Sequence, residues 1–285
     1  MVGRICEPAI CMIHAAIHRV AGHFGELIQG RLGADGPVVL ISLPCPVLTV
    51  TAIATPAQSL SIHSPNGAIL SIARARKFLT LLGLTCPVHV ILNATMPLGG
   101  GAGSSTAALV ALARLAGWNG PAITLARACL AVEGATDPLM FEHPDRLLWA
   151  SRRADIIKPL PALPAFDVLG GFYGPPLRTD AADLAFPDIS DLAHDWHRAA
   201  LAQNLAGLAE LASASAQRTL ALRGAIPDPT AQVAKDLGAL GHVIAHTGSA
   251  RGLLYPRGGI PANARTALHD IGFRGLVHFT AGGAK

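Results

Sequence analysis

Pro97-Leu98-Gly99-Gly100-Gly101-Ala102-Gly103-Ser104-Ser105-Thr106 is the most informative stretch of this chain. It has four glycines in five positions, followed by hydroxyl-bearing residues. Residues 107–116 are strong helix formers, and Gly117 follows them as a stop signal. Glycine lets a ligand approach the backbone, and a helix N-terminus offers unpaired N–H groups and a positive dipole end. The stretch therefore predicts a phosphate-binding loop that runs into a helix.

This loop differs from the two commonest phosphate-binding sequences. It lacks the Gly-Lys-Ser/Thr end of a Walker loop, and Thr106 stands where a dinucleotide fingerprint has its third glycine. Because serine is a favoured N-cap, the alternative is a glycine-rich turn whose serines only cap a buried helix.

The composition fits a globular protein that acts on small molecules. With 285 residues, the chain is long enough for one large or two ordinary domains. Hydrophobic residues at 51% and charged residues at 14% exclude disorder. The net charge is +4, aromatic residues make up only 5%, and no basic block stands beside them. These features exclude a nucleic-acid stacking surface but are compatible with an anionic cosubstrate.

Cysteine usage indicates a reducing compartment. Cys6, Cys11, Cys45, Cys86 and Cys129 are an odd number without C-x-x-C spacing. We therefore expect reduced, mostly buried thiols in a cytoplasmic protein, not a disulfide frame or a zinc site.

Two apolar segments have some features of membrane or targeting signals. Residues 38–57 are uncharged, but Pro44 and Pro46 favour two short strands and a turn over a spanning helix. Residues 1–18 contain Glu7, which a signal peptide would lack, so we interpret them as an N-terminal extension. We expect no membrane span.

Strand-like and helix-like segments alternate along the rest of the chain, without an internal repeat. The composition changes at about residues 155–187, which are rich in proline, and this change indicates a domain junction. The pattern predicts an α+β fold in two lobes. The expected strands are 38–42, 47–53, 60–63, 88–93, 165–169, 243–246, 252–255 and 276–280, and the expected helices are 68–82, 106–116, 123–132, two within 189–222, 230–240 and 263–271.

Three motifs carry a resemblance to a known family. The glycine-rich loop resembles the second motif of the GHMP kinases (galacto-, homoserine, mevalonate and phosphomevalonate kinases). Residues 22–30, Gly-His-Phe-Gly-Glu-Leu-Ile-Gln-Gly, resemble the first motif of the branch that contains the L-threonine kinases of cobalamin synthesis. Residues 245–254 resemble the third motif, a glycine turn that packs beside the active site in the family.

The resemblance covers nearly the whole chain from about Arg19. It implies a two-lobed GHMP kinase fold, with a ribosomal-protein-S5-like N-terminal, ATP-binding domain over residues 19–155. A ferredoxin-like C-terminal domain would follow over residues 156–285, and residues 1–18 would precede both as the extension.

The implied activity is phosphoryl transfer from ATP to a hydroxyl group. L-Threonine is the favoured acceptor, giving O-phospho-L-threonine for the aminopropanol linker of cobalamin. The alternatives are another hydroxyl acceptor such as homoserine, or a catalytically inactive protein of this fold that binds a metabolite. The implied partner is thus a hydroxyl-bearing amino acid, and oligomeric state stays open.

The resemblance also implies roles for particular residues. Ser105 and Glu133 would hold Mg²⁺, which takes hard oxygen ligands. Asp137 would orient or deprotonate the substrate hydroxyl, because the segment around it resembles the Glu-Pro-Thr-Asp of threonine kinases with one extra residue. A solvated helix end for Glu133 and an Asp-Pro turn for Asp137 are the structural alternatives. The residues expected to bind ATP are Pro97, Gly99, Gly100, Gly101, Ala102, Gly103, Ser104, Ser105 and Thr106.

Four further residues are substrate-binding candidates. Glu26 and Gln29 either bind the ammonium and carboxylate of an amino acid or bond buried backbone, and such residues among glycines are unusual for a plain strand. Thr247 contacts substrate or phosphate, or is a turn hydroxyl. Arg251 binds ATP or the product phosphate, or is a surface arginine.

The chain departs from the threonine kinase pattern at three places. Gly100 stands where those kinases often have a lysine, and Ala108 where they have an aspartate. His23-Phe24 replaces a small residue and a cysteine. Arg251 or magnesium is the candidate to compensate for the missing lysine. These departures affect the prediction of the substrate more than the prediction of the fold.

Overall fold

The computed structural model describes residues 16–177, 180, 182–183, 185–223 and 227–283. Its centre is a 10-stranded sheet in the order β10-β7-β9-β8-β1-β2-β4-β3, with β5 pairing β2 and β6. The first 15 residues of the expected N-terminal extension, with Cys6 and Cys11, lie outside the described residues. The strands are β1 (Ala16–Arg31), β2 (Val38–Pro56), β3 (Ser61–His63), β4 (Val88–Ala94), β5 (Leu147–Ala150), β6 (Asp155–Pro159), β7 (Phe166–Phe172), β8 (Gly241–Ile244), β9 (Ala250–Pro256) and β10 (Arg274–Ala281).

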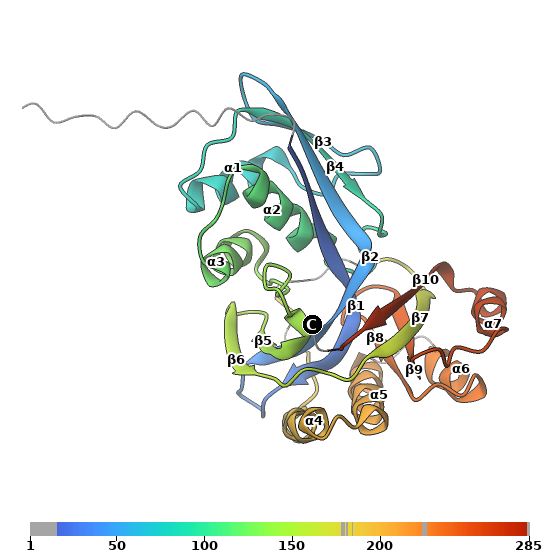
Figure 1. Ribbon diagram of the computed structural model, residues 1–285. Helices are drawn as coiled ribbons and strands as arrows, with labels where there is room; N and C mark the ends of the chain where they lie inside the picture. The colour runs from blue at the N-terminus through green and yellow to red at the C-terminus, as the bar shows by residue number, and fades with distance from the viewer. Residues whose placement is uncertain (1–15, 178–179, 181, 184, 224–226, 284–285) are drawn as a thin grey trace, which may run out of the picture.

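The helices lie in two groups along this sheet. Figure 1 shows α1, α2 and α3 beside the upper part of β1 and β2, and α4 to α7 around the other end of the sheet. The helices are α1 (Ile72–Leu81), α2 (Ser104–Leu115), α3 (Ala122–Glu133), α4 (Ser190–Leu201), α5 (Leu205–Arg223), α6 (Thr230–Asp236) and α7 (Ala264–Ile271).

Helix α2 is buried almost all round. Residues 106–113 are each no more than 3% exposed, because the helix packs against β1 and β2 on one side and against α1 and α3 on the other. A helix without a polar face needs such surroundings. Ala108, one of the departures from the threonine kinase pattern, is fully buried in this layer.

Strands β1 and β2 form a long antiparallel ladder that corrects one expectation. The sequence predicted two short strands and a turn over residues 38–57, whereas β2 is a single strand from Val38 to Pro56. The register jumps where Ala21 faces Thr49 and Gly22 faces Cys45. Pro46 therefore lies in the bulged part of β2, where no N–H is needed for the ladder.

The α+β class is confirmed, as are most of the predicted elements. The two helices expected within residues 189–222 are α4 and α5. Strands β1, β5 and β6 were not among the expected strands, and α6 ends at Asp236, earlier than predicted. The division into domains 19–155 and 156–285 stays a prediction; β1 pairs with β2 on one side and with β8 on the other.

Cys45, Cys86 and Cys129 are all buried, as expected. Burial raises the pKa of the Cys45 thiol to about 12. Among the described helices, none has the length and apolar character needed to cross a membrane.

Candidate active site

A cleft of about 250 Å³ opens where the glycine-rich loop meets β1 and the segment after α3. Its wall includes Gly99, residues 101–106, Glu133 and Asp137. Residues from the second half of the chain complete it, among them Phe186 and Thr247. The cleft thus gathers most of the residues that the sequence analysis selected.

The glycine-rich loop turns its carbonyl groups toward neighbouring segments. Gly99, Gly101 and Gly103 have φ values of 73°, 74° and 71°, which glycine adopts without strain. The Gly99 carbonyl accepts the N–H of Leu177 at 2.9 Å. The Ala102 carbonyl accepts the N–H of His23 at 3.2 Å. These two carbonyl oxygens are therefore bonded to neighbouring segments and do not accept N–H groups of the loop itself.

The amides of residues 101–106 have a different environment. Within the described part of the chain, none of them donates a backbone or side-chain hydrogen bond. Helix α2 begins after Gly103, which has no side chain to cap it. The serines therefore do not cap this helix, and a set of free N–H groups at a helix N-terminus lines the cleft.

Two predicted members of the phosphate loop do not line the cleft. The N–H of Gly100 donates to the Pro97 carbonyl at 3.1 Å, which closes a turn. The Gly100 carbonyl accepts the N–H groups of Ser249 and Ala250 at 3.1 and 2.9 Å. Pro97 and Gly100 therefore shape the loop, and Gly100 has no amide to offer a phosphate.

The turn at Gly248 packs directly on this loop. A Cβ on Gly248, whose φ is +97°, would lie 2.4 Å from the Gly101 nitrogen. A Cβ on Gly101 would lie 2.2 Å from the Thr247 carbonyl oxygen. The two backbones touch because neither residue has a side chain.

Arg251 neither lines the cleft nor lies on the surface, which corrects both interpretations offered for it. Its Nε donates to Asp228 Oδ2 at 2.6 Å, and both side chains are largely buried. Its Nη1 donates to the carbonyl oxygens of Gly248 and Ala250 at 3.1 and 2.9 Å. Burial alone would raise the pKa of Asp228, but Arg251 and hydrogen bonds from Thr230 together outweigh it and the pKa is lowered. Arg251 therefore supports the Gly248 turn.

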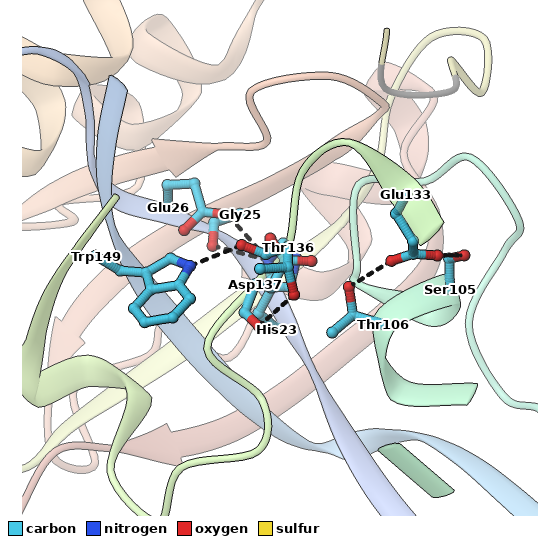
Figure 2. Close-up of polar contacts among 9 residues, drawn as sticks. All are labelled: His23, Gly25, Glu26, Ser105, Thr106, Glu133, Thr136, Asp137 and Trp149. Atoms are coloured by element: carbon cyan, nitrogen blue, oxygen red, sulfur yellow. Dashed lines mark hydrogen bonds and ion pairs between the residues drawn. The ribbon is translucent and has the colours of Figure 1, made fainter. Parts of the chain in front are cut away.

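Glu133, the last residue of α3, turns its carboxylate to the start of α2. Its two oxygens accept the hydroxyls of Ser105 and, at 3.0 Å, Thr106 (Figure 2). The left-handed Gly134 ends the helix directly after it. Burial raises the pKa of Glu133, and the two hydroxyls and Arg74 partly offset this. Glu133 is therefore not a solvated helix end.

The donor set of Ser105 and Glu133 fits Mg²⁺. Both offer hard oxygen atoms, they are in direct contact, and both line the cleft next to the free amides. Arg74 Nη2 lies 2.9 Å from Glu133 Oε1 and keeps this carboxylate in place. Sequence analysis does not single out Arg74, because it is one of several basic residues on the polar face of the helix expected over residues 68–82.

His23, Glu26 and Asp137 form a second cluster in the cleft. His23 Nδ1 lies 3.2 Å from Glu26 Oε1, and His23 Nε2 lies 3.3 Å from Asp137 Oδ2. Period-two alternation would point His23 and Glu26 to opposite faces of β1. The β1–β2 register shifts between His23 and Glu26 and again between Glu26 and Ile28. These bulges let three residues of one strand, His23, Glu26 and Gln29, all reach the cleft.

The segment that carries Asp137 is fixed from behind by β5 and the residue after it. The buried Trp149 donates its Nε1–H to the Thr136 carbonyl at 2.7 Å (Figure 2). The Thr136 N–H donates to the Ser151 carbonyl at 3.0 Å. Asp137 is therefore held at the cleft by more than an Asp-Pro turn.

The charges of this cluster depend on one another. Burial would lower the pKa of His23, but Glu26 and Asp137 outweigh it and raise the pKa to about 9. Burial raises the pKa of Glu26 to about 8, although His23 opposes this. Burial would raise the pKa of Asp137, but His23, together with Arg152 and Thr106, outweighs it and the pKa is lowered. Near neutral pH, Asp137 is thus ionised beside an imidazolium.

Three ligand-type atoms of this cluster lie within 4.8 Å of one another, a spacing that also suits a metal ion. However, the imidazole presents a different nitrogen to each carboxylate. One ion could take only one of these nitrogens, so the geometry fits a shared proton better than a metal.

Several buried polar atoms at the cleft have no partner among the described residues. Gln29 Nε2 donates to the Ile244 carbonyl at 3.3 Å, but Gln29 Oε1 and Glu26 Oε2 are unpaired. Nε and Nη1 of Arg152, another cleft residue that the sequence analysis missed, are also unpaired. Buried polar groups normally have partners, so these atoms point to a ligand.

Comparisons with known proteins agree with the fold and the loop. Residues 67–143 match the family model described as the GHMP kinases N terminal domain. The 4-diphosphocytidyl-2-C-methyl-D-erythritol kinase of Rhizobium etli is 36% identical over 122 residues, which span 39% of this chain and 40% of that protein. The chain therefore matches less than half the length of this curated relative.

Solved structures resemble the chain over nearly its whole length. Homoserine kinase from Cytophaga hutchinsonii is 18% identical with a TM-score of 0.60, and the match covers 93% of this chain and 94% of that one. Phosphomevalonate kinase from Streptococcus pneumoniae is 14% identical with a TM-score of 0.64, covering 95% and 100%. These likenesses show the fold, and residues 67–143 resemble the N-terminal domain of the GHMP kinases.

Gly248→Ala should weaken Mg·ATP binding about tenfold or more, because its Cβ would collide with the Gly101 nitrogen and displace the loop. Calorimetric titration with Mg·ATP measures this. Gly238→Ala is the matched control, since Gly238 also has a positive φ (+65°) but its Cβ would meet nothing within 4 Å. Equal affinities in the two variants would show that the turn does not shape the loop.

Proposed function

We propose that this chain is an ATP-dependent kinase of the GHMP type that phosphorylates the hydroxyl group of a small amino acid, with L-threonine the favoured acceptor. The observation that carries the proposal is the arrangement of the cleft. Free amides and the Ser105–Glu133 oxygens line it together with an ionised carboxylate and unpaired buried acceptors.

In this proposal, the glycine-rich loop binds the phosphate groups of ATP. The amides of residues 101–106 would donate to the phosphate oxygens of ATP, aided by the dipole of α2. Ser105 and Glu133 would hold Mg²⁺, which neutralises phosphate charge when it is bound. Arg74 keeps the Glu133 carboxylate oriented, and Arg251 acts at a distance by holding the Gly248 turn.

In this proposal, Asp137 acts on the hydroxyl group of the acceptor. Its carboxylate accepts the hydroxyl proton while the acceptor oxygen attacks the terminal phosphorus atom. The new O–P bond forms as the bond to the bridging oxygen breaks, and ADP leaves with that electron pair. Holding both reactants in one cleft supplies most of the catalysis, because phosphoryl transfer needs alignment more than covalent help.

The unpaired atoms favour an amino acid over a neutral sugar. Within the described residues, Gln29 Oε1 and Glu26 Oε2 are buried and accept no hydrogen bond, although the nearby Ser42 hydroxyl helps to lower the pKa of Glu26; an ammonium group supplies donors for both. Arg152 lines the same cleft with two unpaired nitrogens and is the candidate partner for a carboxylate. Thr247 also lines the cleft and is within the proposed substrate set.

Two other candidate functions follow from specific observations. The fold shared with the Cytophaga hutchinsonii homoserine kinase makes homoserine the second acceptor to test. The absence of a lysine at position 100 leaves an inactive, metabolite-binding protein as a third. The buried thiols and the metabolite-type cleft support a cytoplasmic site of action.

ADP release should be fastest with L-threonine among threonine, serine, homoserine and simple sugars. The assay couples ADP formation to a spectrophotometric readout at saturating Mg·ATP, with phosphothreonine confirmed by mass spectrometry. Faster turnover with homoserine than with threonine would mean that homoserine is the preferred acceptor. Binding of Mg·ATP without turnover on any acceptor would favour the inactive protein.

Ser105→Ala and Glu133→Gln should each lower turnover about 100-fold, the scale expected when one preorganised charge-stabilising group is lost. The control is Ser104→Ala, which removes the neighbouring hydroxyl that has no bond to Glu133. Circular dichroism confirms that all three variants fold. Wild-type rates in both Ser105→Ala and Glu133→Gln would mean that the magnesium ligands lie elsewhere.

The KM for threonine should fall as the pH rises from 6 to about 8. Burial raises the pKa of Glu26 to about 8, so below this pH the carboxyl is protonated and accepts an ammonium poorly. A site that needs the ionised form improves about tenfold per pH unit below that pKa and levels off above it. Glu26→Gln should remove this slope. A KM that is constant with pH in the wild type, or a slope that survives in Glu26→Gln, would exclude Glu26 as the ammonium ligand.

A further inference from the structure

We propose that His23 is a positioning residue which, as a protonated imidazole bridging Glu26 and Asp137, ties the carboxylate at the acceptor hydroxyl to the phosphate-binding loop. This inference rests on the proposed function, since it gives His23 its task in that reaction. In the sequence, His23 was only a departure from the family pattern.

The hydrogen-bonding partners of the ring require two donors. Nδ1 faces the Gly25 carbonyl at 3.3 Å, and a carbonyl only accepts. Nε2 faces the Asp137 carboxylate at 3.3 Å. A neutral imidazole has one N–H, so it can satisfy only one side, whereas an imidazolium satisfies both. The geometry therefore selects the charged ring while Asp137 is ionised.

The same residue touches the glycine-rich loop in two ways. Its N–H donates to the Ala102 carbonyl at 3.2 Å. A Cβ on Gly103 would lie 2.6 Å from His23 Cδ2 and 3.0 Å from Nε2, so the ring packs against the residue that begins α2. A displacement of either the loop or Asp137 thus has to move His23.

Charged groups on three elements face this cluster. Glu26 lies on β1 with His23, Asp137 follows α3, and Arg152 follows β5 and acts on Asp137 electrostatically. From α2, the Thr106 hydroxyl donates to Glu133 Oε2 at 3.0 Å and also helps to lower the pKa of Asp137. Two cations thus flank one ionised carboxylate, and the loss of His23 charge removes the nearer one.

The consequence for the reaction is geometric as well as electrostatic. His23 is 5% exposed, and its contact occupies Oδ2 of Asp137. The other carboxylate oxygen stays available for the acceptor hydroxyl. Because the ring also packs against Gly103, the carboxylate keeps a fixed distance from the phosphate-binding amides.

A pair of near-isosteric variants tests this assignment. The amide nitrogen of Gln reaches the place of Nε2, and that of Asn reaches the place of Nδ1. His23→Gln therefore keeps the donor to Asp137, whereas His23→Asn keeps the donor to Glu26 and loses Asp137. We expect kcat to fall about tenfold in His23→Gln and about 100-fold in His23→Asn, within the range that a positioned base contributes. The KM for ATP should change less than kcat.

The double variant His23→Asn/Asp137→Asn separates positioning from a structural role. If His23 acts through Asp137, the double variant is no slower than Asp137→Asn alone, because the two effects do not add. If the losses of kcat in the two single variants add fully in the double variant, the inference is overturned. A greater loss of kcat in His23→Gln than in His23→Asn would also overturn it. Turnover by the wild-type protein would still support the proposed kinase activity.

An NMR titration gives a readout independent of turnover. The imidazole C–H resonances of His23, assigned with His23→Gln, should titrate near pH 9 in the wild type and at least one pH unit lower in Asp137→Asn. An unchanged titration in Asp137→Asn would overturn the inference even if no acceptor turns over. If no acceptor is phosphorylated but the His23 titration shifts in Asp137→Asn, the proposed function is overturned and the inference about His23 stands.

Discussion

The site depends on the backbone conformation of the glycine-rich loop, in which amide N–H groups line the cleft while several carbonyl groups bond to neighbouring segments. The carbonyls of Gly99, Gly100 and Ala102 accept hydrogen bonds from Leu177, from Ser249 and Ala250, and from His23, respectively. This arrangement needs positive φ at three alternate glycines and close approach of the Gly248 turn, whose Cβ-free backbone lies on Gly101. In the proposed function, anion binding therefore depends on the conformation of the backbone and does not require a lysine in the loop.

The rest of the fold supplies rigid walls for this loop. Helix α2 is buried on every side, so the amides at its N-terminus are fixed relative to the sheet. Strand β1 passes beneath the loop, and its bulges aim His23, Glu26 and Gln29 into one cleft. The Asp137 segment is held by Trp149 through the Thr136 carbonyl. The cluster proposed to bind metal and phosphate and the cluster proposed to bind the acceptor therefore lie in one rigid framework.

The sequence predicted the loop and α2 because glycine runs and helix formers define them locally, and the resemblance to the family selected Glu133 for a role that stays a prediction. The sequence could not show that Gly100 uses its own amide in a turn, or that Arg251 faces Asp228, since both depend on long-range contacts. His23, Arg74 and Arg152 were missed for the same reason. A histidine in a strand shows its role only when bulges and a distant loop bring two carboxylates to its ring.

The most direct test is an NMR titration of ¹⁵N-glycine-labelled protein with Mg·ATP. The account predicts large shifts for the amide resonances of Gly101 and Gly103, with Gly238, remote from the cleft, unmoved. Saturable shifts confined to other glycines, or none at all, would contradict the claim that these amides bind the phosphates.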